Sequence, residues 1–172
     1  MNSKFELLSW NVKGIKTREK QEKLWECMKR RKTISCWCLQ EHHLDASTPR
    51  KQTLGEYLFF YGSGPDGFSG VMIAVHRDLE PKVVLQHPSG RALEISIKVH
   101  NSILTIVNIY APNDSKNRKL LWKDLSQSNI EGEFCLVGDF NMVCSRQDRQ
   151  GPANILAGGN VISGQPLRRN GL

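Results

Sequence analysis

The sequence lacks any apolar run that could cross a membrane and any recognisable leader segment. A membrane-spanning helix needs about 20 consecutive apolar residues, and no stretch of the 172 residues comes near that length. The N-terminus, Met1 to Lys4, leads straight into a short apolar run, without the long apolar region and small-residue cleavage site of a signal peptide. We therefore expect neither export nor membrane association. The expected location is intracellular, and nuclear if the protein is functional.

Cysteine is scarce, odd in number and without the paired spacing of a zinc site. The five cysteines are Cys27, Cys36, Cys38, Cys135 and Cys144. Cys36 and Cys38 lie inside an apolar run, where alternation puts both side chains on one face of a strand. Because free cysteine behaves as a small hydrophobe, we expect buried reduced thiols, which suit an intracellular compartment.

Positive charge, in contrast, is plentiful. The net charge is +7 and the sequence pI is near 9.3, which favours a polyanionic partner such as DNA. Nearly all of the excess lies between Lys13 and Lys32, where nine basic and three acidic residues give a net +6. Two interpretations stay open. Glu19 and Lys23 stand at helical spacing, which indicates a solvated helix face, whereas proximity to Asn11 indicates a nucleic-acid rim.

Apolar periodicity predicts a strand-rich chain with few helices. Helices are expected over about 17–31 and 115–125, and strands over 5–10, 34–39, 57–61, 71–75, 83–85, 93–99, 103–110 and 134–137. The run 34–39 is apolar on both faces, as in an interior strand. The run 93–99 alternates, as in a half-buried strand followed by a hairpin turn at 100–102. These elements indicate an α/β sandwich.

Four of the apolar runs are followed directly by polar side chains. Asp139 and Asn141 come after 134–137 and Gly138, and period-two alternation puts them on the same side of the chain. The other runs lead into Asn11, into Gln40 and Glu41, and into Tyr110. Each of these groups can bind a metal, a phosphate or water. Each also has a structural alternative: a surface carboxylate, an Asx-type turn, or a phenol facing water.

Five segments in order resemble motifs of the endonuclease/exonuclease/phosphatase superfamily, whose fold is that of DNase I. They are Ser9-Trp10-Asn11-Val12-Lys13-Gly14, Leu39-Gln40-Glu41-His42, Ser69-Gly70-Val71-Met72-Ile73, Asn108-Ile109-Tyr110-Ala111-Pro112-Asn113 and Val137-Gly138-Asp139-Phe140-Asn141. Within the superfamily, the residues of these five motifs are most similar to those of the apurinic-type endonuclease domain of plant-type LINE (non-LTR) retrotransposons. The resemblance covers roughly residues 5–150 and implies a two-sheet αββα sandwich.

The resemblance also implies Mg²⁺-dependent hydrolysis of phosphodiesters in DNA, with Mn²⁺ as an alternative cofactor. It makes Glu41 the metal ligand, with Asn11 beside it on metal-bound water or phosphate. The rest of the implied catalytic set consists of Asp139, which orients or deprotonates the attacking water, Asn141, which holds that water or a phosphate oxygen, and Tyr110, whose phenol lies on the phosphate. The implied substrate contacts are Asn113 and Lys13. His42 and His43 are assigned to the rim, because Mg²⁺ prefers oxygen ligands.

The sequence departs from the family pattern at its end. Family members continue for about a further third and finish in a Ser-Asp-His motif, which this chain does not contain. We expect an incomplete domain over 1–150. Residues 151–172 hold five glycines and two prolines without sustained periodicity, which predicts a poorly ordered tail. Three functions are compatible: a nuclease domain cut short, whose activity is doubtful, a nucleic-acid-binding remnant without catalysis, and a phosphatase of the same superfamily.

Overall fold

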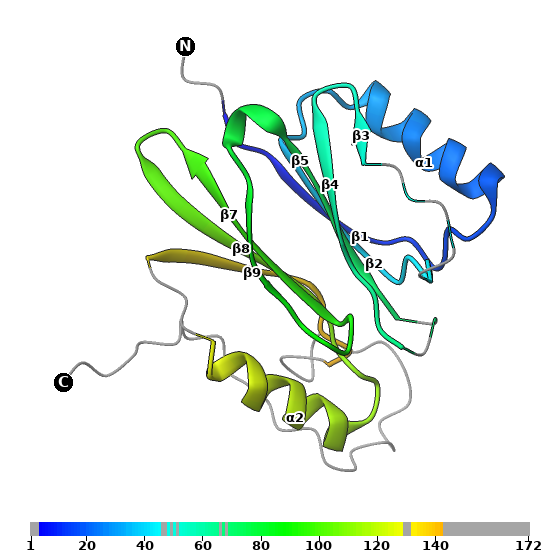
Figure 1. The fold of residues 1–172 in the computed structure, drawn as a ribbon, viewed down its shortest axis with the longest axis vertical. Coiled ribbons are helices and arrows are strands. Elements are labelled where there is room, and N and C mark those ends of the chain that lie inside the picture. Colours follow the sequence, from blue (N-terminus) through cyan, green and yellow to red (C-terminus); the bar gives the residue numbers. More distant parts are fainter. Residues whose placement is uncertain are drawn as a thin grey trace, which may run out of the picture.

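The computed structural model describes residues 4–45, 48, 50, 52–65, 67, 69–128 and 132–142. They form two β-sheets packed face to face, with one helix on the outer side of each sheet (Figure 1). The predicted two-sheet αββα sandwich is therefore confirmed.

The first sheet combines one parallel strand pair with antiparallel neighbours. Its strands, in spatial order, are β1 (Leu7–Asn11), β2 (Cys36–Gln40), β5 (Val71–His76), β4 (Tyr57–Gly62) and β3 (Thr53–Leu54). β1 and β2 are parallel and are joined by helix α1 (Arg18–Arg30). The crossover helix makes the carboxyl ends of β1 and β2 lie together.

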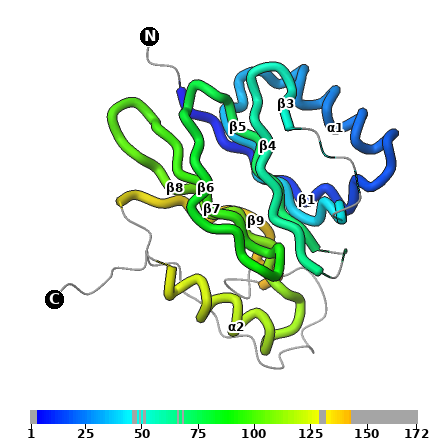
Figure 2. Tube along the Cα trace, in the orientation of Figure 1, coloured from blue at the N-terminus to red at the C-terminus, as the bar shows by residue number. Residues whose placement is uncertain are grey.

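The second sheet repeats this arrangement. Its order is β6 (Lys82–Gln86), β7 (Ala92–Val99), β8 (Ser102–Tyr110) and β9 (Glu133–Asp139), and a short 3₁₀ turn, η1 (Arg77–Leu79), precedes it. β8 and β9 are parallel and the chain between them forms helix α2 (Ser115–Ser126). Figure 2 shows β6 beside β7, at the edge of this sheet away from β9. Each sheet thus contains one parallel strand pair, and in each pair the carboxyl ends of the two strands lie together.

Each helix begins at a side-chain cap and covers its sheet with a short apolar stripe. Thr17 caps α1 by accepting a hydrogen bond from the Lys20 amide, and Asp114 caps α2 by accepting one from the Asn117 amide. The side chains that α1 buries are Leu24, Trp25 and Met28, and α2 buries Leu121. Leu120, although it stands next to Leu121 in the sequence, is exposed.

The core between the sheets is built from the inward residues of both. It contains Cys36, Cys38, Val71, Ile73 and Val75 from the first sheet and Leu93, Ile95, Ile97, Ile106 and Tyr110 from the second. Cys36 and Cys38 lie 3.9 Å apart at their sulfur atoms on one face of β2, and burial raises the pKa of the Cys38 thiol. The four cysteines among the described residues are unpaired, as predicted, and Cys144 lies outside those residues.

Every predicted helix and strand is present, with small shifts at the ends. β3 and η1 are additional elements that apolar periodicity does not predict. The prediction of a half-buried β7 is wrong at its start, because α2 and its neighbours cover the outer face there, so Ala92 and Glu94 are buried as well. Neither helix of the described part combines the length and the apolar character that a bilayer span requires. The predicted tail at 151–172 lies outside the described residues.

Candidate active site

Four of the predicted site residues meet where the two parallel strand pairs end. In the first sheet Asn11 pairs with Gln40, and Glu41 follows directly. In the second sheet Tyr110 pairs with Asp139. Because the sheets pack face to face, the carboxyl ends of the two pairs lie opposite each other (Figure 1). The strand-end pattern therefore brings together residues that are far apart in the sequence.

The Asn11 amide forms the centre of this cluster. Its Nδ2 donates to Glu41 Oε1 at 2.7 Å and to Asp139 Oδ2 at 2.9 Å. Its Oδ1 accepts a hydrogen bond from the Lys13 backbone N–H at 3.0 Å. Both amide protons and the amide oxygen are thus used, which fixes the orientation of the side chain. Asn11 holds a carboxylate of each sheet in place.

Asp139 and Asn141 combine turn chemistry with membership of the site. Asp139 Oδ1 accepts from the Asn141 backbone N–H at 3.1 Å, which is the Asx-type turn considered as the structural alternative. Its other oxygen accepts from the Asn11 amide, so the turn is present and Asp139 still faces the cluster. Asn141 Nδ2 donates to the Ala111 carbonyl at 2.7 Å. Any contact of Asn141 with water or substrate therefore falls to its Oδ1.

Gly138 is required where β9 approaches β8. Its φ is +139° and an added Cβ would lie 1.9 Å from the Ile109 carbonyl oxygen. No side chain fits between these backbones, so only glycine permits the close approach. The glycine sets the position at which Asp139 leaves the strand.

Tyr110 lies beside the carboxylates and is mostly buried. Burial raises the pKa of its phenol above the ordinary value, and the Glu41 carboxylate, which accepts a hydrogen bond from the phenol, raises it further. The Arg91 guanidinium stacks over the ring at 4.9 Å from its centre, and Arg91 Nη1 donates to the Tyr110 carbonyl at 3.4 Å. Tyr110 therefore remains a neutral hydrogen-bond donor at neutral pH.

Arg91 is a residue of the site that the sequence analysis missed. The signal was available in the hairpin, because the turn at His100 and Asn101 pairs Val99 with Ser102. Counting the register back along both strands places Arg91 opposite Tyr110, whose N–H donates to the Arg91 carbonyl at 2.8 Å. The hairpin register thus places the positively charged Arg91 side chain beside Tyr110, at the edge of the carboxylate cluster.

Asn108 and Gln40 form a second missed feature, a buried polar link beneath the site. Asn108 Oδ1 accepts from Gln40 Nε2 at 2.7 Å, and Asn108 Nδ2 donates to the Leu39 and Met72 carbonyls, both at 3.0 Å. Both side chains are buried. The signal was an amide inside the apolar run 103–109. Because buried polar groups need partners, this link fixes how β8 sits against β2 and β5.

The two histidines after Glu41 have different roles, and the rim assignment of His42 is wrong. His42 is fully buried. Its Nδ1 accepts from the Leu44 N–H at 2.8 Å, which leaves Nε2 to donate to the Gly62 carbonyl at 3.1 Å. Burial lowers its pKa to about 4. His43 does lie at the rim, half-buried, with Nε2 3.7 Å from Glu41 Oε2.

The left-handed φ of +56° at Glu41 explains the burial of His42. This conformation reverses the chain after β2 and sends the next side chain into the core rather than to the surface. The left-handed φ at Glu41 could not be predicted from the residue type, since such a φ is uncommon outside glycine and asparagine.

The two predicted substrate contacts are exposed at the ends of loops. Lys13 follows Asn11 by two residues and has a φ of +50°. Asn113 precedes α2, and its carbonyl accepts from Arg118 Nη1 at 2.8 Å. Both positions leave the side chains open to solvent.

The basic segment divides into two parts, and its second part does not border the site. After α1 the chain returns to the beginning of β1, since the Ile34 N–H donates to the Arg31 carbonyl and the Ser35 N–H to the Glu6 carbonyl. β1 spans five residues, so the positions 29–32 lie roughly 13 Å or more from Asn11 at about 3.3 Å per residue. Lys29 to Lys32 therefore do not lie beside Asn11, which favours the solvated-face interpretation for them.

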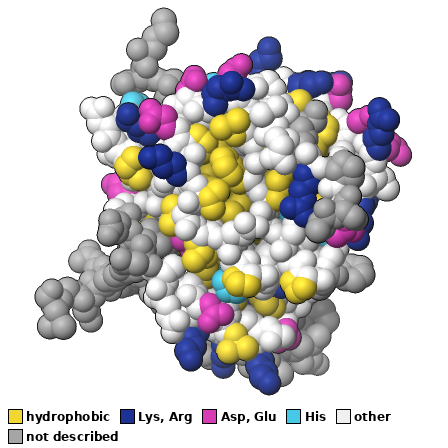
Figure 3. Space-filling view, in the orientation of Figure 1, with side chains coloured by type: hydrophobic (Ala, Val, Ile, Leu, Met, Phe, Trp, Pro, Cys, Tyr) yellow, Lys and Arg dark blue, Asp and Glu magenta, His cyan; other side chains and the backbone are white. Residues whose placement is uncertain are grey.

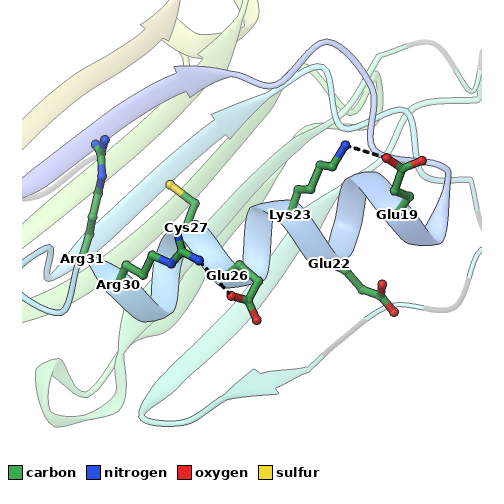
Figure 4. Close-up of a pocket in the computed structure, with 7 residues that line it drawn as sticks. All are labelled: Glu19, Glu22, Lys23, Glu26, Cys27, Arg30 and Arg31. Atoms are coloured by element: carbon green, nitrogen blue, oxygen red, sulfur yellow. Dashed lines mark hydrogen bonds and ion pairs between the residues drawn. The ribbon is translucent and has the colours of Figure 1, made fainter.

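The exposed side of α1 carries charges of both signs, as the solvated-face interpretation predicts. Lys23 contacts Glu19 at 2.5 Å and Arg30 contacts Glu26 at 3.6 Å (Figure 4). A hollow of about 560 Å³ on this helix is lined by Glu19, Glu22, Lys23, Glu26, Cys27, Arg30 and Arg31. It lies apart from the carboxylate cluster. Exposed ion pairs of this kind contribute little stability.

Residues 8–168 match the Endonuclease/Exonuclease/phosphatase family. Among solved structures, the chain is similar to the AP endonuclease LMAP from Leishmania major, with 19% identity and a TM-score of 0.68 over 87% of this chain and 59% of that one. It is similar to an AP endonuclease from Archaeoglobus fulgidus, with 21% identity and a TM-score of 0.65 over 86% of this chain and 62% of that one. It is also similar to the endonuclease domain of TRAS1, a telomere-specific non-LTR retrotransposon, with 19% identity and a TM-score of 0.60 over 81% of this chain and 61% of that one.

These similarities establish the fold. They also show that the chain spans about three fifths of the length of the structures it matches.

Proposed function

Because the chain belongs to the Endonuclease/Exonuclease/phosphatase family, we propose that the cluster of Asn11, Glu41, Tyr110 and Asp139 serves the metal-dependent hydrolysis of phosphodiesters in DNA. One observation carries the proposal: the Glu41 and Asp139 carboxylates, one from each sheet, share the amide nitrogen of Asn11. Such a cluster combines the negative charge that a cation needs with a neutral phenol facing the same space.

The donor set fits a hard divalent cation. Among the described residues, neither Glu41 nor Asp139 forms an ion pair with a lysine or arginine, and the one histidine contact is that of His43 with Glu41 at 3.7 Å. Carboxylate oxygens are the preferred ligands of Mg²⁺, which uses one or two of them and keeps several waters. Glu41 would hold Mg²⁺, or Mn²⁺ in its place. When bound, the cation supplies charge neutralisation on the phosphate and makes a coordinated water more acidic.

The protein groups around the cation then have separate tasks. Asp139, fixed by Asn11 and by the Asn141 N–H, would orient the attacking water and accept its proton. Tyr110, whose raised pKa keeps the phenol protonated, would turn its one O–H from Glu41 to a phosphate oxygen when substrate binds. Asn11 acts as a positioning residue for both carboxylates.

Additional contacts would hold the substrate in place. Arg91, stacked on Tyr110, would add positive charge near the phosphate, where an arginine offers a fork of donors. Asn141 would hold water or a phosphate oxygen through Oδ1. Lys13 and Asn113, both exposed, would contact the DNA backbone.

DNA is the substrate that the charge favours. The net charge of +7 suits a polyanion, and three structures similar to this chain are endonucleases by name. The LINE-type assignment rests on the resemblance of the five motifs and on the similarity to the TRAS1 domain. A nuclear location would follow from such a substrate.

A second candidate is DNA binding without catalysis. Its support is the net charge of +7, which suits a polyanion whether or not the polyanion is cleaved.

Nicking of supercoiled plasmid by the full chain separates the two candidates. Slow nicking that requires Mg²⁺ or Mn²⁺, stops with EDTA and disappears in Glu41→Gln supports hydrolysis. The matched control is Glu56→Gln, a carboxylate paired with Arg77 outside the cluster, which should leave the rate unchanged. Retention of plasmid in a gel-shift assay without any nicking would favour binding alone, and full nicking in EDTA would contradict the metal assignment.

A further inference from the structure

The turn between β6 and β7 carries Arg91 to the edge of the candidate active site. His87, at the start of the turn, donates its backbone N–H to the Ala92 carbonyl at 3.0 Å, and its own carbonyl accepts from the Gly90 N–H at 2.9 Å. Arg91, at the end of the turn, stacks its guanidinium over the Tyr110 ring. Contacts that fix this turn therefore also fix the position of a cation beside the carboxylate cluster.

The imidazole of His87 organises the turn from within. Its Nδ1 accepts from the Ser89 backbone N–H at 3.2 Å, so Nδ1 carries no proton, and the Ser89 hydroxyl at 2.8 Å also donates to it. The Ser89 Oγ in turn accepts from the Arg91 backbone N–H at 3.3 Å. The hydrogen bonds thus run in one direction, from Arg91 through Ser89 to His87.

The other ring nitrogen of His87 faces helix α2. With Nδ1 unprotonated, the ring proton lies on Nε2, which is 3.5 Å from Asp124 Oδ2. Figure 3 shows side chains of both charges and a histidine around α2, in the lower part of the view. The His87 side chain is 15% exposed and that of Asp124 53% exposed. Because an exposed contact of this kind contributes little stability, its main effect is to orient the ring.

Glu94 contributes a second carboxyl group on the outer face of β7. It is fully buried, and burial raises the pKa of its carboxyl, while the Ser128 hydroxyl and His87 act in the opposite direction. The His87 ring therefore lies between a carboxyl group of the sheet and one of the helix.

The far side of the turn is fixed by close backbone packing. Gly90 has a φ of +67°, and an added Cβ would lie 1.9 Å from the Gly64 backbone nitrogen, so only glycine fits there. The Ser69 hydroxyl donates to the Ser89 carbonyl at 3.3 Å. The turn is thus held by the β4–β5 loop on one side and by the His87 ring on the other.

We propose that His87 is a positioning residue for Arg91, which it holds in place through Ser89 so that the guanidinium stacks on Tyr110 and reaches a bound phosphate. The phosphate contact rests on the proposed function, whereas the position of Arg91 over Tyr110 does not. The alternative is an ordinary turn, in which His87 stabilises the fold without any effect on the Arg91 side chain. The two alternatives differ in a property that can be measured directly.

NMR spectroscopy of the full chain measures the position of Arg91. The Tyr110 ring current moves the side-chain protons of the stacked Arg91 upfield, and the loss of these resonances in Arg91→Lys assigns them. We expect His87→Phe and Ser89→Ala each to move the Arg91 resonances to the values of an unstacked arginine. A variant that only lowers stability would leave the resonances of the folded chain unchanged.

A conservative variant and a matched control locate the effect. His87→Asn should restore the upfield shift, because the asparagine side chain offers an acceptor oxygen near the position of Nδ1. His76→Phe is the control, since His76 Nδ1 also lies 3.5 Å from an aspartate, Asp78, outside this turn. It should leave the Arg91 resonances where they are.

DNA binding in EDTA tests the phosphate contact without hydrolysis. Arg91→Gln should weaken the binding of a short duplex, and the slope of log K against log salt should fall by up to about 0.9 for the phosphate that is no longer neutralised. His87→Phe should weaken binding in the natural chain but not in the Arg91→Gln background, because a residue that acts through Arg91 has no effect once the guanidinium is gone.

Unchanged Arg91 resonances in folded His87→Phe and Ser89→Ala would overturn the proposal, and so would an equal loss of the shift in His76→Phe. If His87→Phe does not fold, Ser89→Ala decides, since it removes a single oxygen atom. Loss of the shift together with DNA binding that is insensitive to Arg91→Gln would support the positioning role and contradict only the phosphate contact. Weaker DNA binding by His87→Phe with the shift retained would overturn the positioning role.

Discussion

The amide nitrogen of Asn11 lies 2.9 Å from Asp139 Oδ2, although the two residues are 128 positions apart in the sequence. The bond connects the edge strand of one sheet with that of the other. The same amide nitrogen holds Glu41 at 2.7 Å. Asn11 therefore contributes to the stability of the sandwich as well as to the arrangement of the site.

Asn11→Ala should lower the free energy of unfolding by about 1–3 kcal/mol, because two carboxylates lose a hydrogen-bond donor. Urea denaturation measures the change. Asn113→Ala, an exposed amide in a loop, is the matched control and should stay within about 0.5 kcal/mol.

Asp139→Asn tests the pairwise character of this effect. In a double-mutant cycle, Asn11→Ala should cost less in the Asp139→Asn background than in the natural chain, because residues in direct contact are coupled. Purely additive changes would show that Asn11 acts on stability through some other contact.

His42 makes the stability of the fold depend on pH. Its pKa is lowered to about 4 in the folded chain from about 6.5 in the unfolded chain, so the unfolded chain binds the proton more readily. The contribution is therefore complete above about pH 6.5 and falls as the pH drops towards 4, by about 3 kcal/mol in total. Chemical denaturation at a series of pH values measures this slope.

The control for His42 is His100, an exposed histidine in the β7–β8 turn. His42→Gln should flatten the slope between pH 4 and 6.5, at a cost in stability at pH 7, since its ring bridges Leu44 and Gly62. His100→Gln should leave the slope intact. An unchanged slope in His42→Gln would contradict the assignment.

Asn108→Ala should destabilise the fold by about 3 kcal/mol, because Gln40 and two backbone carbonyls lose buried partners. The matched variant Asn101→Ala removes an exposed amide from the turn at the other end of β8 and should change stability by less than about 0.5 kcal/mol. Equal effects of the two substitutions would mean that the link between the sheets is not a major stabilising contact.

The site could be predicted from the sequence where its geometry follows from simple periodicity. Asn11, Glu41, Tyr110 and Asp139 each follow an apolar run, and parallel strands align their carboxyl ends. Arg91 could have been found from the hairpin register. The burial of His42 could not, because it depends on a left-handed φ at Glu41 that residue types do not reveal.

The basic segment shows a different kind of error. Its charge was counted along the sequence, but a helix that connects two parallel strands must return to the start of the second strand. Lys29 and Lys32 therefore had to lie near the beginning of β2 rather than beside Asn11. A strand–helix–strand topology drawn from the predicted elements would have placed the two ends of the basic segment at opposite ends of the helix.

DNA binding should reflect this separation. Replacement of Lys13 and Lys16 by serine removes two exposed charges from the loop after β1. The slope of log K against log salt should fall by up to about 0.9 for each phosphate that the protein no longer neutralises. Replacement of Lys29 and Lys32 by serine removes the same charge from the other end of α1 and should leave the slope unchanged. If the slope falls when Lys29 and Lys32 are replaced but not when Lys13 and Lys16 are replaced, the nucleic-acid rim interpretation would apply to Lys29 to Lys32.

Metal binding can be measured without any catalysis. If Glu41 and Asp139 face a divalent cation, Mg²⁺ should stabilise the folded chain, by about 1.4 kcal/mol at ten times its dissociation constant. Thermal unfolding in Mg²⁺ and in EDTA should then differ by a few degrees.

Glu41→Gln and Asp139→Asn should each reduce or abolish that shift, because each removes one of the two negative charges that share the Asn11 amide. Glu56→Gln, whose carboxylate pairs with Arg77 at 3.0 Å, should retain it. A shift of equal size in all three variants would indicate general ion binding at the surface. The absence of any shift in the natural chain would mean that its carboxylate pair does not bind Mg²⁺ without further residues, and would favour DNA binding without catalysis.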